Sequence, residues 1–411
     1  MDKEALITAN LESLTPIWTG NAFGKTTKIK ASSILGSIRW WYEIICRSLE
    51  KRVCDNESSK KCELKEREFL KDLSENMDED KALDDQKICP VCKLFGCNGW
   101  AGKIKLIVDD RRGENTTDEV QKIQIETRRE STKKRSLEGK MFKKGGTLKL
   151  SIYPVKELKT EEIELLNLTI RIISDYAALG SRTSQGNGII KIIPENPDRK
   201  YNIKIKKESP KNSKKENWKI PALENFFFLK IHLKFEEDIS SIIKGNYFWT
   251  GDTDEKNKKD KNKKDKDKKD KDKKDKDKKD KDNSNLKKWE TNWTRYGFIP
   301  IGFHIRDVIR RVVEDKRLRH ELFGKYEGSK IFVSHGYKID EKTVEVRIWG
   351  YYGSNEIKKL VSEIKSKLKD GKSLKDNLFI DNYNKYNKNL NVNIYSSLYG
   401  QELLEKYLKK V

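Results

Sequence analysis

The sequence has no long apolar run and few histidines or cysteines. Among its 411 residues are four histidines, six cysteines and three methionines. No apolar segment approaches the roughly 20 residues of a membrane-spanning helix. The opening residues, MDKEALITAN, lack the basic, apolar and small-residue zones of a secretory signal peptide. Six cysteines in so long a chain do not form a disulfide framework, and a CxxC pair is typical of a reducing compartment. We therefore expect a cytoplasmic protein that does not enter a membrane.

The sequence also lacks the motifs of common hydrolases and metal-dependent nucleases. It has no GxSxG, no HD pair and no acidic cluster suited to two metal ions. None of the histidines has an HxH, HxxxH or HExxH neighbour, and all four lie in the second half: His232, His304, His320 and His335. We therefore expect a protein that is not an enzyme. The alternative is a metal-independent endoribonuclease in which a histidine, with His304 as candidate, reaches an RNA 2′-hydroxyl.

Charge favours a polyanionic partner. Lys and Arg number 89 against 66 Asp and Glu, a net charge of +23. A tract at 258–282 holds 15 Lys and 9 Asp, a net +6, which leaves +17 on the rest of the chain. So basic a body favours nucleic acid over a membrane surface. The tract contains four KKDKD copies and no apolar residue, so it predicts a disordered insertion at about 252–288.

One block of residues occurs twice in the same order. Ile34, Ile38 and Arg39 on a helical stripe are followed by Leu-Phe-Gly at 94–96 and Lys-Ile at 103–104. Ile301, Ile305 and Arg306 are followed by the same letters at 322–324 and 330–331. The helices match with an offset of 267 positions and the Leu-Phe-Gly blocks with 228. The difference of 39 equals the length of a charged segment at 50–88, so we predict two homologous domains.

Hydrophobic periodicity predicts the same elements in each half. In the first half, strands are expected at 5–14, 102–109, 121–127, 145–154 and 188–193, with helices at 31–53 and 159–179. In the second half, strands are expected at 224–236, 329–334, 343–351 and 391–396, with helices at 301–316 and 355–369. The predicted fold class is α+β, with tandem ferredoxin-like (RRM-like) βαββαβ domains that carry insertions. The expected domains are 1–194, with a charged and cysteine-containing insertion at 50–101, and 221–411, joined by a linker at 195–220.

A glycine-rich segment at 180–188 is the first candidate RNA-binding site. Gly180, Gly186 and Gly188 allow positive φ angles, and successive N–H groups there could hold a phosphate beside Asn187. Arg182 adds a bidentate phosphate donor. The alternative is a helix C-cap followed by a plain turn.

The second candidate is the Arg39-Trp40 pair. A tryptophan beside an arginine can stack on unpaired bases, although the same pair also suits a subunit contact. Just upstream, Lys25, Lys28 and Lys30 extend the positive charge, and Arg306 occupies the corresponding position in the second half.

The third candidate is a metal site at the Cys-Pro-Val-Cys sequence. Cys89 and Cys92 have the spacing of a zinc knuckle, and Cys97 is close by. Cys54 and Cys62 could fold back, but their spacing specifies nothing. A structural zinc is therefore one interpretation, and a reduced thiol cluster without metal is the other.

These motifs together resemble the RAMP superfamily of CRISPR RNA-binding proteins, and within it the subunit-one family of type III-B (Cmr) effector complexes. The resemblance is carried by residues 14–20 (LTPIWTG), 37–41 (SIRWW), 89–96 (CPVCKLFG), 99–101 (GWA), 179–188, 305–307 (IRD) and 321–324 (ELFG).

The resemblance implies a non-catalytic subunit that binds guide RNA toward its 3′ end, or guide and target RNA together, beside other subunits of the complex. Arg39, Trp40 and the glycine segment with Arg182 would face RNA. Only in the first copy is the arginine followed by Trp-Trp, so we expect the first domain to make most of the contacts with RNA.

Overall fold

The computed structural model describes residues 4–20, 28–55, 61–75, 78–110, 114–115, 121–127, 131–137, 139–142, 148–194, 221–245, 247–251, 293–325, 328–369, 386 and 388–407. Lys25, the predicted linker at 195–220 and the predicted Lys/Asp insertion at 252–288 lie outside these residues.

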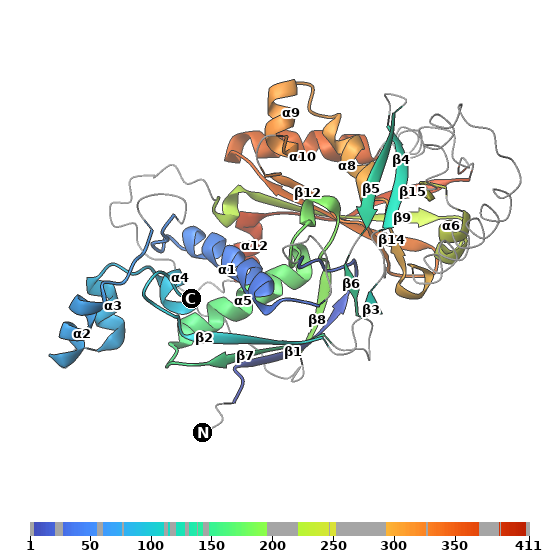
Figure 1. Cartoon of the computed structure of the whole chain (residues 1–411). Coiled ribbons are helices and arrows are strands. Elements are labelled where there is room, and N and C mark those ends of the chain that lie inside the picture. Colours follow the sequence, from blue (N-terminus) through green and yellow to red (C-terminus); the bar gives the residue numbers. More distant parts are fainter. Residues whose placement is uncertain are drawn as a thin grey trace, which may run out of the picture.

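An antiparallel four-stranded sheet forms the first half of the chain. Its strands are β1 (Ile7–Ser13), β2 (Ile104–Asp109), β7 (Leu148–Pro154) and β8 (Ile190–Pro194), in the order β2-β7-β1-β8. Buried and half-buried residues alternate along β1, because one face of the sheet packs on helices α1 (Ala31–Ser48) and α5 (Thr160–Tyr176). In Figure 1 these helices lie directly above the sheet.

A larger antiparallel sheet forms the second half. Its strands are β9 (Phe226–Phe235), β11 (Phe298–Ile299), β12 (Ile331–Val333), β13 (Gly336–Lys338), β14 (Thr343–Tyr351) and β15 (Leu390–Tyr399). The order is β11-β13-β14-β9-β15, and β12 also pairs with β14. Helices α8 (Gly302–Arg310) and α10 (Ser354–Lys369) contribute to its core. If β12 and β13 count as one interrupted strand, both sheets have the same order of strands.

The two halves pack through β9. Phe226 and Phe228 point toward α1 and α5, with the Trp41 ring centroid 5.3 Å from Phe226 and the Tyr176 centroid 5.6 Å from Phe228. The alternate residues, beginning with Phe227 and Leu229, enter the core beneath α8 and α10. The molecule is therefore layered as sheet, helices, sheet, helices, from bottom to top in Figure 1. Burial on both faces explains why β9 begins with four apolar residues in succession.

Two further contacts cross the predicted domain boundary. The hairpin of β4 (Gln121–Thr127) and β5 (Ser131–Leu137) pairs with β10 (Thr250–Gly251) of the second half. The last helix, α12 (Gly400–Tyr407), returns to the first half, where the Tyr407 hydroxyl donates to Asp175 Oδ2 at 2.9 Å. None of the described helices is long and apolar enough to cross a membrane.

Some predicted elements were wrong in extent. The helix expected at 31–53 ends at Ser48, and the one expected at 301–316 ends at Arg310 and is followed by α9 (Lys316–Phe323). The charged segment at 50–88, for which no helix was expected, contains α2 (Glu66–Ser74) and α3 (Glu79–Asp85). These short helices were missed because they are mostly charged and bury few side chains.

The remaining elements of the described residues are short. They are α4 (Pro90–Phe95), α6 (Ile239–Gly245), β3 (Glu114–Asn115), β6 (Lys140–Met141) and the 3-10 turns η1 (Thr183–Gln185) and η2 (Leu223–Asn225).

The repeated arginines make equivalent contacts in the two halves. Arg39 Nη1 donates to the carbonyl of Gly96 at 2.9 Å, and Arg306 Nη2 donates to the carbonyl of Phe323 at 2.8 Å. Arg306 Nη1 also donates to the Ile331 carbonyl at 2.6 Å. Each arginine thus fastens its helix to the Leu-Phe-Gly turn. The arginines that repeat in the sequence thus make similar contacts in the two halves.

We predict that Arg306→Ala destabilises the fold, because buried carbonyls of the turn lose their donor. Burial lowers the pKa of Arg306 to about 10, and nearby Arg310 adds to the effect. Losing such donors costs about 1–3 kcal/mol per unsatisfied group, measured as the free energy of unfolding in urea. Arg306→Lys should restore only part of the lost stability, because a lysine cannot donate to several acceptors in one plane. The exposed Arg317 on α9 provides the control; equal effects of Arg306→Ala and Arg317→Ala would contradict the prediction.

Candidate nucleic-acid interface and metal site

The glycine-rich segment is held tightly to residues 16–18. The Ser181 N–H donates to the Trp18 carbonyl at 2.8 Å, and the Gly188 N–H donates to the Pro16 carbonyl at 2.9 Å. Gly188 has φ 90°, and a Cβ there would lie 2.1 Å from the Leu179 carbonyl oxygen. Only glycine allows this approach.

The end of the segment is buried at the junction between the halves. A Cβ on Gly186 (φ 101°) would lie 2.7 Å from the His335 ring, and the His335 backbone N–H donates to the Gly186 carbonyl at 3.1 Å. Asn187 is also buried. The N–H groups of Gly180, Ser181, Gly186 and Gly188 all donate within the protein. The alternative of a plain turn therefore describes these amides better than a phosphate cradle does.

The outer part of the segment carries Arg182. This residue has a left-handed conformation (φ 58°), and its guanidinium lies 4.2 Å from the centre of the Trp18 ring. Thr19 connects the same place to the residues before α1, because its hydroxyl donates to the Lys28 carbonyl and accepts from the Lys30 N–H. The structure thus places Arg182 on Trp18 and the backbone of Lys28 and Lys30 on the adjacent Thr19. We call Lys28, Lys30 and Arg182, with Trp18, the basic surface.

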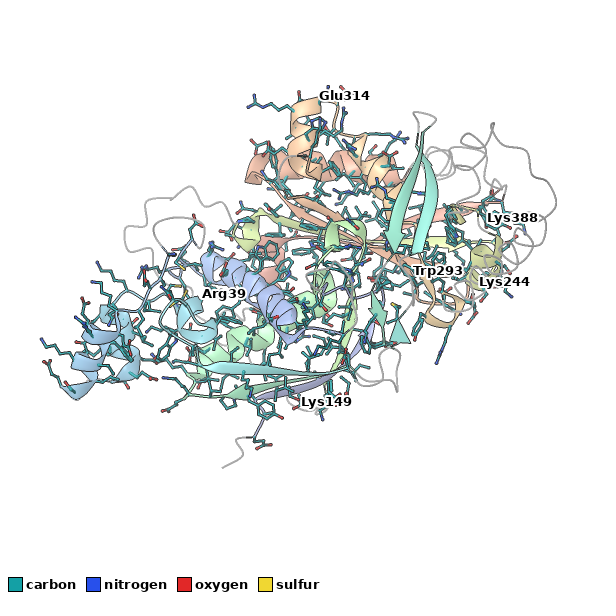
Figure 2. All side chains as sticks on the ribbon, in the orientation of Figure 1. Arg39, Lys149, Lys244, Trp293, Glu314 and Lys388 are labelled. Atoms are coloured by element: carbon teal, nitrogen blue, oxygen red, sulfur yellow. The ribbon has the colours of Figure 1, made fainter. Side chains whose placement is uncertain are left out.

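Arg39 and Trp40 have structural contacts instead of open exposure. Arg39 pairs with Glu43 at 3.0 Å and donates to Cys92 Sγ at 3.4 Å, in addition to Gly96. Figure 2 labels Arg39 on α1, on the side that faces α4. Trp40 is half-buried, with its ring centroid 4.9 Å from Trp41. The prediction that these side chains touch RNA stays a prediction, and the contacts of Arg39 favour a role in packing.

A cavity of about 340 Å³ adjoins the basic surface. It lies where α1, the glycine-rich segment and the second sheet meet. Its lining consists of Ser33, Gly36, Ser37, Trp40, Trp41, Ala178, Gly180, Ser181, Thr183, Phe332 and Trp349.

Four buried cysteines converge beside α1. The sulfur atoms of Cys54, Cys62, Cys89 and Cys92 all lie within 4.8 Å of one another. Tetrahedral zinc with four thiolates at about 2.3 Å separates the sulfurs by about 3.8 Å, so the arrangement could hold a metal ion. Two backbone amides, of Cys89 and Cys92, already point at sulfur atoms of the group.

This group differs from the ligand set expected from sequence. Cys89 and Cys92 belong to it, but Cys97 does not; the other two members come from the charged insertion. The spacing of Cys54 and Cys62 does not predict a metal site. Only the folding of the insertion onto α1 brings the two pairs together.

His304 and His335 are buried and make hydrogen bonds within the protein. Burial lowers the pKa of His304 to about 4, and its Nε2 lies 2.6 Å from the Phe248 carbonyl. Burial also lowers the pKa of His335 to about 3, where Nδ1 accepts the Gly302 N–H. His232 is partly exposed and lies 3.1 Å from Glu345. The burial and the backbone contact of His304 disfavour this residue as the general base of a nuclease.

Comparison with known proteins finds a family resemblance in the first half of the chain. Residues 10–191 match the family model of the RAMP superfamily. This part of the chain is similar to that superfamily. The match spans the whole first sheet except the ends of two strands, together with the cysteines and the glycine-rich segment. No curated protein matches the sequence.

Two solved structures are similar to the chain. Cmr1 from Pyrococcus furiosus, crystallised in its apo form, is 11% identical with a TM-score of 0.33, over 84% of this chain and 88% of that one. A chain of the type III-B Cmr-beta complex bound to cognate target RNA is 15% identical with a TM-score of 0.26. That second match covers 46% of this chain and 54% of the other, about half its length.

Proposed function

We propose that the protein is a non-catalytic RNA-binding subunit of a type III-B CRISPR effector complex. Its ligand would be guide RNA, toward the 3′ end, or guide RNA paired with target RNA, and its partners the other subunits of the complex. The observation that carries the proposal is the RAMP-superfamily match over residues 10–191, which includes every residue of the basic surface. The shared strand order of the two sheets supports a tandem ferredoxin-like arrangement within the same proposal.

The basic surface supplies the chemistry for this role. Lys28 and Lys30 can pair with phosphates, and Arg182 offers several donors beside the Trp18 ring. An indole beside cations also suits an unpaired base. Arg306 has a different setting, because its guanidinium serves the turn before β12. The proposal therefore assigns RNA binding mainly to the first half.

We also propose that the four cysteines hold a structural zinc ion. Zinc supplies no reaction step here; it would fasten the charged insertion to α1. The NH···S contacts from Arg39 and from the amides of Cys89 and Cys92 support the assignment, because such donors stabilise bound thiolates.

Removing charge from the basic surface should weaken RNA binding. We expect Lys28→Ala with Arg182→Ala to lower affinity for single-stranded guide RNA by about fivefold per side chain, or about 1 kcal/mol each. The slope of log affinity against log salt should fall by about 0.7 for each lost phosphate contact. Filter binding or fluorescence anisotropy at several salt concentrations measures both. The control is the double variant Lys358→Ala with Lys369→Ala on α10, which removes the same charge from exposed positions of the second half. Equal losses in the two double variants would refute the site.

The nuclease alternative makes an opposite prediction. We expect a repeat-containing RNA to stay intact when it is incubated with the protein and EDTA for hours. A denaturing gel measures the cleavage. Cleavage that disappears in His304→Ala or in His232→Ala would overturn the non-catalytic assignment. His232 is included because it is the histidine paired with a carboxylate.

Zinc binding is tested by metal content. We expect about one zinc per chain by elemental analysis, and its loss in Cys54→Ser, Cys62→Ser, Cys89→Ser or Cys92→Ser. Cys97→Ser and Cys46→Ser should keep the metal, because neither belongs to the group of four. Chelation should lower the melting temperature of the parent, since metal bound only by the folded state stabilises that state. A metal-free parent, or equal loss in the Cys97 variant, would contradict the assignment.

A further inference from the structure

We propose that the cavity between the two halves receives a single unstacked nucleobase of the bound RNA. This inference rests on the proposed RNA-binding function and goes further, because it names a specific subsite and places it partly in the second half.

The walls of the cavity are aromatic. Trp40 and Trp41 come from α1, whereas Phe332 and Trp349 come from neighbouring strands of the second sheet. The rings of Phe332 and Trp349 are themselves stacked, with centroids 5.3 Å apart. Aromatic surfaces of this kind bind the flat faces of bases. At about 340 Å³ the cavity is in the lower range for small-ligand sites, which suits one base and not a folded peptide segment.

The rim of the cavity provides hydrogen-bonding groups for the edges of a base. The hydroxyls of Ser33, Ser181 and Thr183 have no hydrogen-bond partner among the residues that the structure describes. Ser37 is different, because its hydroxyl donates to the Ser33 carbonyl and accepts from the Gly180 N–H. Three hydroxyls that can donate or accept suit the mixed polar edge of a base better than a purely apolar group.

The charge beside the cavity argues for a nucleotide over another aromatic ligand. Arg182 lies between two lining residues, Ser181 and Thr183, and Lys30 precedes the first turn of α1, one turn from Ser33. A phosphate held on the basic surface would place its own base at the mouth of the cavity. Because both halves line the cavity, a bound base would also hold them together.

Gly36 offers a way to fill the cavity without disturbing the fold. It lies on α1, lines the cavity and has no heavy atom within 4 Å of the position of an added Cβ. Leucine is also a better helix former than glycine. Gly36→Leu is therefore expected to fold at least as well as the parent while its side chain occupies the space for a base. Gly36→Ala is the matched control, since a methyl group leaves most of that space open.

The experiment measures binding of short single-stranded RNAs that each carry one abasic nucleotide at a different position. For the parent and Gly36→Ala, one position should lower affinity by about five- to a hundredfold, the range found when one stacked base is lost. Gly36→Leu should bind intact RNA more weakly by a similar factor and should show no sensitive position. A 2-aminopurine placed at the sensitive position should be quenched on binding to the parent but not to Gly36→Leu.

The outcomes separate this inference from the function on which it rests. If Gly36→Leu binds every RNA as the parent does, the subsite is refuted. If the Lys28 and Arg182 variants still lose affinity in that case, RNA binding at the basic surface stands without it. If neither set of variants changes RNA binding, the proposed function fails as well. Stability of each variant in urea shows that a loss of binding is not a loss of folding.

Discussion

The packing of β9 between two pairs of helices is the constraint on which the rest of the structure depends. Its first residues alternate between two cores, with Phe226 and Phe228 against α1 and α5 and Phe227 and Leu229 beneath α8 and α10. A strand buried on both faces has a strongly specified register, because a shift by one residue would exchange the two sets. The first half cannot cover its helices without this sheet. The chain is thus one body built from two similar halves, and the cavity lies at the edge of their contact.

The arginines show how a repeated residue can mislead an interpretation of function. A basic residue at the same place in both halves, in a strongly basic chain, favours a ligand contact. In the structure, however, Arg39 and Arg306 both satisfy carbonyl groups of the turn that follows their helix. Helical periodicity placed Arg39 opposite the apolar stripe, which is correct for an isolated helix. It could not show that the cysteine-bearing insertion covers that side, where Glu43 and Arg47 are also buried.

Much of the fold could be predicted because its elements have strong local patterns. The strand at 343–351 and the helix at 354–369 were expected almost to the residue, since apolar positions recur with the period of each structure. Elements with weak patterns were missed. The α2 helix buries only Phe69 in nine residues, and α12 was not expected at all. In the cysteine group, the CxxC spacing drew attention to Cys89 and Cys92. Cys54 and Cys62 join them only through tertiary structure, which the sequence spacing does not show.

The same limit explains why the basic surface was only partly anticipated. Lys28, Lys30 and Arg182 were each chosen for charge, yet no sequence pattern joins residues about 150 positions apart. Trp18 and Thr19 make the connection, one beneath the Arg182 guanidinium and the other bonded to the backbone of residues 28 and 30. The buried end of the glycine-rich segment then fixes this surface against the second half through Gly186 and His335. The basic surface thus combines positive charge with a rigid support from the second half. Such support favours binding, because a side chain already held in place loses less entropy when it contacts a ligand.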